Sequence, residues 1–401
     1  MRTNKLVALI ATFVASFGAL FFMAAPHAFA ATRTWVGTDC PATNCNWSNV
    51  NNWSGGVAPV NGDSIVINSD TVTPAKFQAT TDDIAALSVA SITTSGYSNS
   101  SQGPYSMTIN TTQSLTITGN VTHTVTATAA PSGWNIASFL ALGDAVHPIV
   151  LGGNVTTQNV ALIASTITLG GNTLNYNLDP TYTDTTFSLE AQLTGAGTFN
   201  IDLPTNVALF LDDTNNYSGT TNINSVNYVS ALGDSTKVFG TSAVNLSSTA
   251  RILFKPIASG AVTINNAISV TPPTVTGTFL NNQLEFWSET GGSSFTIPNI
   301  TLLGNARFGT NDLAGAVSVN LAGITANGHC IQYGDGNSDV ANFSNGPAAC
   351  VVAVAAGKKA PNTGFASVSS NPIAVLAVSF ASAGAIYYIA RRSAKSTSKK
   401  H

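Results

Sequence analysis

The segment Leu151-Gly152-Gly153-Asn154 recurs eighteen residues later as Leu169-Gly170-Gly171-Asn172. A turn that returns at an interval of about twenty residues is what a β-solenoid needs, because each coil must come back to stack on the one before it. Glycine supplies a positive φ at such a turn, and asparagine tolerates a left-handed bend while pairing with its neighbours along the stack. The repeat therefore predicts a solenoid of stacked strands.

Short runs of alternating apolar residues surround this repeat and extend through most of the chain. They lie at Leu87–Val89, Met107–Ile109, Leu115–Ile117, Val121–Val125, Ile163 and Ile167–Leu169. A period of two residues is typical of strands, and the central part of the chain has no convincing helical period. We expect an all-β fold, namely a single-stranded parallel β-helix or solenoid. The alternative is a tandem β-sandwich, in which turns would come about every 8–12 residues.

The composition is unusually poor in charge. Charged residues make up 8% of the chain, whereas about a quarter is usual. Between residues 31 and 363 the 18 acidic residues face eight Lys and Arg, which gives a formal charge of −10. That balance disfavours nucleic acids and anionic membrane surfaces as partners. Asn, Thr, Ser and Gly fill the polar positions, which suits stacked strands with polar side chains paired in ladders.

Three tryptophans, Trp35, Trp47 and Trp53, stand close together near the start of the predicted solenoid. The terminal coils of a solenoid must be capped, because they have no neighbour to bury their core. We therefore expect these rings to cover one end of the core. The alternative is an exposed aromatic surface that stacks on glycans.

Two segments carry a family resemblance. Residues 35–67, with their W…NW..G..P…D pattern, resemble the first coils of secreted β-helical proteins of the autotransporter-passenger type. Residues 193–199, 215–224 and 231–233 resemble one imperfect copy of the autotransporter-associated β-strand repeat, L-x-G-x-G-T-L, N-x-Y-x-G-x-T-x-I and A-L-G. The resemblance implies an extended surface module without enzymatic activity. At about 4.8 Å per coil, its rod would be on the order of 80 Å long at most.

The N-terminus has the features of an export signal. An apolar run at residues 6–25 follows two cations, and Ala28 and Ala30 form an A-x-A cleavage site. We expect residues 1–30 to be a signal peptide and the mature chain to begin at Ala31. Because the apolar run is long, an uncleaved membrane anchor is the alternative.

The C-terminus has a second targeting pattern. Pro361, Asn362, Thr363 and Gly364 precede a polar spacer, the apolar run 373–390 and a basic tail. This order resembles the cell-wall sorting signal of bacterial surface proteins. The resemblance implies that a sortase-type transpeptidase cuts between Thr and Gly and joins the Thr carboxyl group to an amine of the cell wall.

The apolar run 373–390 is also long enough to anchor the chain directly. At about 1.5 Å per residue it would extend roughly 27 Å, the thickness of a hydrocarbon core, with the basic tail on the cytoplasmic side. Ala360 stands where the sorting motif has Leu, so both sorting to the wall and retention in the membrane stay open. We therefore divide the chain into a signal peptide (1–30), a β-solenoid ectodomain (31–359) and a sorting signal (360–401).

Four cysteines, Cys40, Cys45, Cys330 and Cys350, lie in the expected exported part, where disulfides persist. Four cysteines allow three pairings. We expect Cys40–Cys45 and Cys330–Cys350, two local loops near the ends of the ectodomain. A metal site would need tighter clusters with His.

No catalytic site can be assigned from the sequence, which has no nucleophile elbow, P-loop or dinucleotide-binding glycine pattern. His123, His147 and His329 have no second His or Cys at ligand spacing, and we expect them to be structural or exposed.

Three acidic pairs could serve a β-helical polysaccharide lyase or hydrolase. They are Asp82 with Asp83, Asp212 with Asp213, and Glu285 with Glu289. Adjacent residues of a strand point to opposite faces, and a paired-carboxylate mechanism needs two carboxyl groups across a cleft. We therefore expect these acids to be solvated loop residues.

One segment has the beginning of a calcium loop. Asp335, Asn337 and Asp339 have D-x-N-x-D spacing, but Val340 and Gly346 replace the glycine and glutamate that an EF-hand requires. These three residues are kept as a candidate for loose Ca²⁺ binding, and no other metal or cofactor is expected.

The sequence as a whole predicts an exported, non-enzymatic β-helical protein of the cell surface that acts as an adhesin, stalk or coat component. Its expected partners are the sortase-type enzyme, the cell wall, and a glycan or the surface of a host or partner cell. Two alternatives are a displayed polysaccharide lyase or glycoside hydrolase, and a self-assembling surface-layer subunit.

Overall fold

The computed structural model describes residues 30–40, 44–68, 79–96, 107–125, 140–178, 186–203, 208–211, 215–224, 228–233, 236–256, 260–272, 283–288, 292–311, 316–334 and 342–350. Within these ranges the fold is all-β apart from one short 3-10 helix, η1 (Val50–Asn52). Thirty strands form three sheets, and every pair of named strands is parallel.

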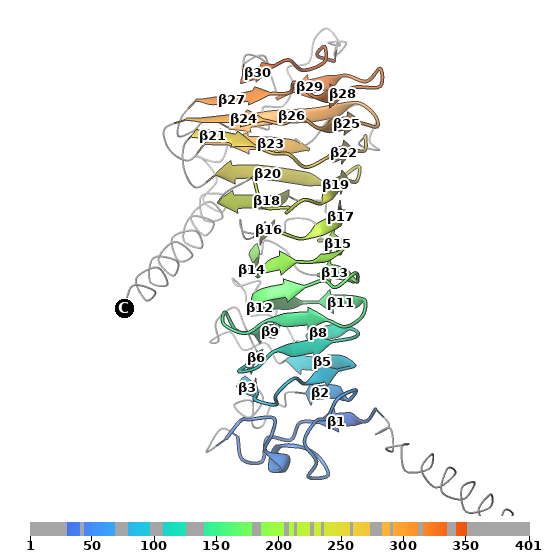
Figure 1. The fold of residues 1–401 in the computed structure, drawn as a ribbon, viewed down its shortest axis with the longest axis vertical. Helices are drawn as coiled ribbons and strands as arrows, with labels where there is room; N and C mark the ends of the chain where they lie inside the picture. Colours follow the sequence, from blue (N-terminus) through green and yellow to red (C-terminus); the bar gives the residue numbers. More distant parts are fainter. Residues whose placement is uncertain are drawn as a thin grey trace, which may run out of the picture.

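The strands stack in coils from β1 at one end of the molecule to β30 at the other (Figure 1). The 12-stranded sheet contains, in spatial order, β1 (Thr32–Thr34), β2 (Ser64–Asn68), β5 (Ser91–Gly96), β8 (Val121–Val125), β11 (Val155–Gln158), β13 (Thr173–Asn177), β15 (Ala196–Asp202), β17 (Ser218–Ile223), β19 (Ala243–Leu246), β22 (Ile268–Val270), β25 (Ile300–Leu302) and β28 (Ile324–Thr325).

The 14-stranded sheet contains β3 (Ala79–Asp82), β4 (Ser88–Val89), β6 (Met107–Thr111), β7 (Leu115–Ile117), β9 (Leu140–Gly143), β10 (Ile149–Leu151), β12 (Val160–Thr168), β14 (Thr186–Thr194), β16 (Ala208–Leu211), β18 (Tyr228–Gly233), β20 (Arg251–Pro256), β23 (Leu284–Trp287), β26 (Ala306–Asn311) and β29 (Ile331–Tyr333). A 4-stranded sheet joins the last coils, with β21 (Gly260–Thr263), β24 (Ser293–Thr296), β27 (Val317–Asn320) and β30 (Phe343–Ser344).

The parallel, coil-on-coil pairing is solenoid-like, as the repeat predicted. It differs from a tandem β-sandwich, whose sheets are antiparallel. The interval between paired residues is less regular than expected: Ile149 pairs with Ile167, but Ile268 pairs with Ile300. Since the longer coils use more residues per step, the 12 strands of the sheet rise only roughly 50 Å at about 4.8 Å per step.

The core is built from rows of side chains that continue from coil to coil. One inward row of the 12-stranded sheet runs in register through Ile65, Ile92, Val121, Thr157, Tyr176, Ile201, Ile223, Leu246, Val270 and Leu302. All of them are buried. Because successive strand residues point to opposite faces, the residues between them form outer rows. The alternation of apolar and polar residues in the sequence follows from this alternation of inward and outward side chains.

The two Leu-Gly-Gly-Asn segments form turns, but their glycines act differently. Gly170 and Gly171 have φ values of 61° and 85°, as expected for left-handed positions. The expectation was wrong for Gly152 and Gly153, which are needed for close packing: an added Cβ would lie 2.8 Å and 2.4 Å from atoms of Thr118.

The asparagines of the same turns pair along the stack as predicted. The Asn172 side chain donates to the carbonyl oxygen of Leu151 (2.8 Å), and Asn154 accepts from the amide of Thr173 (2.9 Å). Neither asparagine has a positive φ, so their role is pairing between coils and not a left-handed bend.

The tryptophans close the first coil, which confirms the capping prediction. Trp35, Trp47 and Trp53 are at most 2% exposed, and the rings of Trp35 and Trp47 meet Trp53 edge-on at 5.0 and 5.7 Å. The Trp47 indole also donates to the Thr80 hydroxyl (3.1 Å), which ties the cap to β3. Buried rings of this kind offer no surface for stacking on a glycan.

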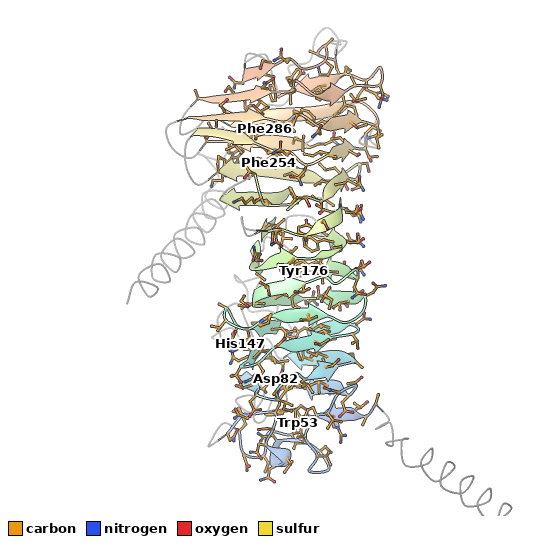
Figure 2. All side chains as sticks on the ribbon, viewed as in Figure 1. Trp53, Asp82, His147, Tyr176, Phe254 and Phe286 are labelled. Atoms are coloured by element: carbon orange, nitrogen blue, oxygen red, sulfur yellow. A yellow bond between two sulfur atoms is a disulfide. The ribbon has the colours of Figure 1, made fainter. Side chains whose placement is uncertain are left out.

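The disulfide prediction is also confirmed. Cys40 bonds to Cys45 beside the tryptophan cap, and Cys330 bonds to Cys350 at the other end. Figure 2 shows Trp53 at one end of the stack and Phe254 and Phe286 toward the opposite end, where these two rings stack at 5.6 Å. Each disulfide therefore fixes the chain at a terminal coil, where fewer neighbours hold it in place.

Candidate binding surface

A row of asparagine side chains runs along the outer face of the 12-stranded sheet. Asn175, Asn200, Asn222 and Asn245 lie in register on β13, β15, β17 and β19. Each amide nitrogen donates to the side-chain oxygen of the asparagine in the preceding coil, at 2.6, 2.7 and 2.9 Å. Asn175, the first of them, donates to the hydroxyl of Thr156 (3.1 Å). We call these four asparagines the asparagine ladder.

The same row continues beyond the ladder with short hydroxyl side chains. Ser269, Thr301 and Thr325 follow Asn245 in register on β22, β25 and β28. The row is therefore polar and uncharged from Thr156 to Thr325.

The hydrogen bonds among the described residues leave part of the bonding capacity of the ladder unused. An asparagine amide has two N–H donors and an oxygen with two lone pairs. The bonds to the coils on either side use one donor and one lone pair of Asn200 and of Asn222. Each of these two asparagines therefore has one further donor and one further acceptor for a ligand or for water on the outer face.

An open depression follows the ladder at its C-terminal end. Its lining residues are Asn200, Asn222, Asn224, Asn245, Leu246, Ser247 and Thr271. Asn224, Ser247 and Thr271 come directly after the inward residues Ile223, Leu246 and Val270, so they form a second outer row beside the ladder. None of the lining side chains carries a charge.

Aromatic residues support the ladder from inside the core. The ring of Phe199 packs edge-on against Tyr176 at 6.5 Å and against Tyr217 at 6.3 Å. Tyr217 is fully buried and its hydroxyl pairs with that of Thr221, while burial raises the pKa of Tyr217 to about 12. These packed rings make the strands below the depression a rigid base.

The residues that match the β-strand repeat hold coils together. Asn215 is buried, accepts from the amide of Leu193 (2.6 Å) and donates to the carbonyl oxygen of Val238 (2.7 Å), and so links three coils. Gly219 has a φ of 115°, and an added Cβ would lie 2.2 Å from the carbonyl oxygen of Gly197. The motif is therefore structural in this chain.

The expectation that Asp82 is solvated was wrong. Its side chain is fully buried, as Figure 2 places it within the lower coils. Oδ1 accepts from the amide of Ile84 (3.1 Å), whereas Oδ2 and the in-register hydroxyl of Thr111 have no hydrogen-bond partner among the described residues. Burial, aided by the charge of Asp83, raises the pKa of Asp82 to about 7. Asp83 behaves differently and accepts from the amide of Ser48 (2.8 Å).

Glu285 is not a solvated loop acid either. It lies on β23 with its side chain 14% exposed, 3.0 Å from Nη2 of Arg251 in the preceding coil. The Trp287 indole donates to its other oxygen (2.9 Å), and the ammonium of Lys255 lies 5.4 Å from the centre of the Trp287 ring. The described contacts of Glu285 are thus a cation and an indole, where a paired-carboxylate mechanism would place a second carboxyl group.

The described histidines fit the structural prediction. His123 is fully buried with Nδ1 2.7 Å from the Thr94 hydroxyl, and burial lowers its pKa to about 4, so it is neutral. His147 pairs with Asp144 at 2.9 Å on the surface. Partial burial alone would raise the pKa of Asp144, but hydrogen bonds from His147 and from the amide of Val146 lower it. His329 is half-buried in the turn before β29.

A buried carboxylate near the N-terminus was not predicted. The Asp63 side chain is 1% exposed and accepts from the Arg33 guanidinium (2.6 Å) and from the backbone nitrogens of Ala31 (2.8 Å) and Val60 (3.0 Å). Burial alone would raise the pKa of Asp63, but these hydrogen bonds and the charge of Arg33 outweigh it and lower the pKa.

Several predicted residues lie outside the described part of the chain. They are Ala28, Asp212, Asp213, Glu289, the calcium candidates Asp335, Asn337 and Asp339, the sorting motif Pro361, Asn362, Thr363 and Gly364, and the apolar run 373–390. Among the residues that are described, no cluster of three or more His, Cys, Asp or Glu is arranged to hold a metal ion. Across the same residues, no helix is long and apolar enough to span a bilayer.

In the described residues, the fold and this surface define a solenoid-like, all-β protein with an uncharged amide ladder on an outer face. Comparisons of the chain with protein-family models, with curated proteins and with solved structures give no match.

Proposed function

We propose that this protein is an exported, surface-anchored, single-stranded parallel β-helix that acts without catalysis as an adhesin, stalk or coat component. The observation that carries the proposal is the outer face of the 12-stranded sheet, where one uncharged row repeats from Thr156 to Thr325. A repeating face suits contact with a repeating partner, such as a polysaccharide or a crowded cell surface, because many weak contacts then add.

The covalent structure supports export. Both disulfides belong to the described fold, and such bonds persist in oxidising compartments outside the cytosol. The A-x-A site at Ala28 and Ala30 then accounts for secretion, and the motif from Pro361 to Gly364 for transfer to the wall by a sortase-type enzyme. If sorting fails, the run 373–390 holds the protein in the membrane.

The two ends of the stack support a rod that works as a single unit. The tryptophan cap and the Cys40–Cys45 loop cover the first coil, and the segment around Ala349 pairs with Ile331 on the last. Covered ends and short edge strands disfavour end-to-end growth. These features favour an anchored stalk or adhesin over a self-assembling surface-layer subunit.

The lyase or hydrolase alternative would have to use Glu285. Both oxygens of this carboxylate accept hydrogen bonds, from Arg251 and Trp287, which positions it as a structural ion-pair partner. A glycosidase pair needs its second carboxyl group at a defined gap, roughly 5–9.5 Å away. Release of shorter products from a polysaccharide, lost in Glu285→Gln, would establish the enzyme in place of the binding protein.

The anchoring is tested by mapping the C-terminus of the protein after cell-wall digestion. We expect the last peptide to end at Thr363 and to carry a wall fragment on its carboxyl group. Thr363→Ala should abolish this product, whereas Ser369→Ala in the spacer should leave it unchanged. A wall-digested protein that still contains residues 373–390 would overturn sorting and leave a membrane anchor.

A further inference from the structure

The depression beside the asparagine ladder has the chemistry of a binding site for an uncharged, hydroxyl-rich ligand. Asn200 and Asn222 each have a donor and an acceptor beyond those that the ladder uses, and Asn224, Ser247 and Thr271 add amide and hydroxyl groups. Sugar hydroxyls both donate and accept, so they match this set of paired donors and acceptors. Charged ligands find no counter-ion among the lining residues.

The acidic residue Asp202, close to the depression, favours a neutral ligand over an acidic one. Asp202 is exposed at the end of β15, in register with Asn177 and one coil before Asn224 on the same face. Its carboxylate would repel an acidic polymer that lay along the depression. A neutral polysaccharide meets no such repulsion.

The ladder is also arranged before any ligand arrives. The amides of Asn200 and Asn222 are held by bonds to the coils on either side, over the packed rings of Phe199 and Tyr217. Side chains already fixed lose little conformational freedom on binding, so a modest number of hydrogen bonds can give useful affinity. The same groups recur at about 4.8 Å along the stack, so a linear polymer meets them repeatedly.

We propose that the depression along Asn200, Asn222 and Asn245 binds a linear, neutral polysaccharide that lies along the stack of coils. This inference rests on the proposed function as a binding protein of the surface. It names the class of ligand and the face that takes it.

The test is retention of the purified full chain on immobilised neutral glucan, mannan and galactan, each beside its sulfated derivative. We expect retention on at least one neutral polymer and weaker retention on its sulfated form. Asn222→Thr should weaken that retention about tenfold, the effect of losing a few hydrogen bonds. The matched control is Asn68→Thr, which changes an exposed asparagine of β2 on the same sheet and should leave retention unchanged.

Three results would overturn the proposal: no neutral polymer retained, equal retention of Asn222→Thr and the unchanged protein, or stronger retention on the sulfated forms. Thermal unfolding of both variants confirms that the coils are intact. Mapping of the C-terminus after cell-wall digestion tests the anchoring independently of the ligand. A failure of the ligand proposal can therefore be distinguished from a failure of the surface-protein proposal.

A second, independent observation concerns the expected cleavage site. The nitrogen of Ala31 lies 2.8 Å from Oδ1 of the buried Asp63, whose other oxygen is 2.6 Å from Nε of Arg33. Cleavage after Ala30 converts this amide nitrogen into an ammonium group, whose usual pKa is about 7.7–8.0. We infer that removal of the signal peptide creates an ion pair between the new ammonium group and the buried Asp63, which fixes β1 on the first coil.

The inference rests on cleavage after Ala30, which N-terminal sequencing of the mature protein tests separately. The mature protein is compared before and after selective acetylation of its α-amine, with mass spectrometry showing unmodified lysines. We expect acetylation to lower the melting temperature by roughly 3 °C or more in the unchanged protein and to have little effect in Asp63→Asn.

The pH dependence provides a second measurement should Asp63→Asn fail to fold. The carboxylate raises the pKa of the ammonium in the folded state, so its contribution is present at neutral pH and is lost as the pH rises through that value. The difference in melting temperature between the unmodified and the acetylated protein should therefore begin to shrink above about pH 8 and disappear once the pH exceeds the raised folded pKa. Equal melting temperatures of the two forms at pH 7 would refute the ion pair.

Discussion

The outer faces of the two long sheets follow different rules. The face of the 12-stranded sheet carries one uncharged row that repeats from coil to coil, with the asparagine ladder at its centre. The face of the 14-stranded sheet, at β20 and β23, instead places Arg251 against Glu285 and Lys255 over Trp287. The ladder row of the first face is regular and uncharged, whereas the described contacts at β20 and β23 on the other face are irregular and charged.

The difference follows from parallel stacking in register. A side chain in such a stack has its neighbours in the same row, about 4.8 Å away in the coils above and below. A charge repeated along a row would repel its own copies, whereas an amide both donates to one copy and accepts from the next. Charges are therefore accommodated where the adjacent coil supplies the opposite sign, as Arg251 does for Glu285. This explains why only 8% of the chain is charged.

Asp82 provides the strongest test of this rule, because its coil neighbour is Thr111 and not a cation. Burial raises its pKa from 3.8 to about 7 in the folded protein. Since the folded pKa of Asp82 lies above the unfolded one, the contribution of Asp82 to stability is greatest below about pH 4 and falls as the pH rises toward 7. We expect a loss on the order of 3 kcal/mol across that window, measured as the free energy of unfolding in denaturant.

The matched controls use another buried carboxylate. Asp82→Asn should remove most of the fall in stability between pH 4 and 7, because the amide does not titrate. Asp63 has a cation partner and a lowered pKa, so its contribution is present above the unfolded pKa and disappears as the pH falls through the folded value. A pH profile unaffected by Asp82→Asn would show that this side chain is not the group responsible.

The charged face provides the second test. Arg251→Ala leaves the nearly buried Glu285 with only the Trp287 indole as a described partner. We expect the free energy of unfolding to fall by about 2 kcal/mol. Adding Glu285→Gln should restore part of it, because the uncompensated charge is then gone. A double-mutant cycle by thermal unfolding measures the coupling; additive effects of the two changes would mean that the pair contributes nothing.

The sequence predicted the elements that depend on local patterns. Alternation marked the strands, the Leu-Gly-Gly-Asn repeat marked turns, and Cys40 and Cys45 were close enough to indicate their bond. The composition predicted ladders of polar side chains, but not which asparagines form one, because the members are separated by intervals of unequal length and only the register brings them together. The burial of Asp82 was missed for the same reason: an acid at the end of a strand looks solvated until the coil below is known.

The smallest expected effect concerns the neutral face itself. Asn222→Asp keeps the size of the side chain but replaces an amide donor with a carboxylate, so the bond to Asn200 is lost and two acceptors face each other. The bond from Asn245 is kept and strengthened by the charge. Because residue 222 is half-exposed, the free energy of unfolding should fall by about 1 kcal/mol. This difference should vanish below about pH 4, where the new aspartate takes up a proton.

Asn68→Asp on β2 is the control, because the described hydrogen bond of the Asn68 side chain is one that it accepts from Ser95, which a carboxylate also accepts. The double variant Asn200→Asp with Asn222→Asp should lower the free energy of unfolding by more than the sum of the two single variants, because it places like charges in adjacent coils. If the double variant is instead simply additive at low salt, charge repulsion between coils is not what keeps this row neutral, and the ladder would have to owe its composition to the ligand it binds.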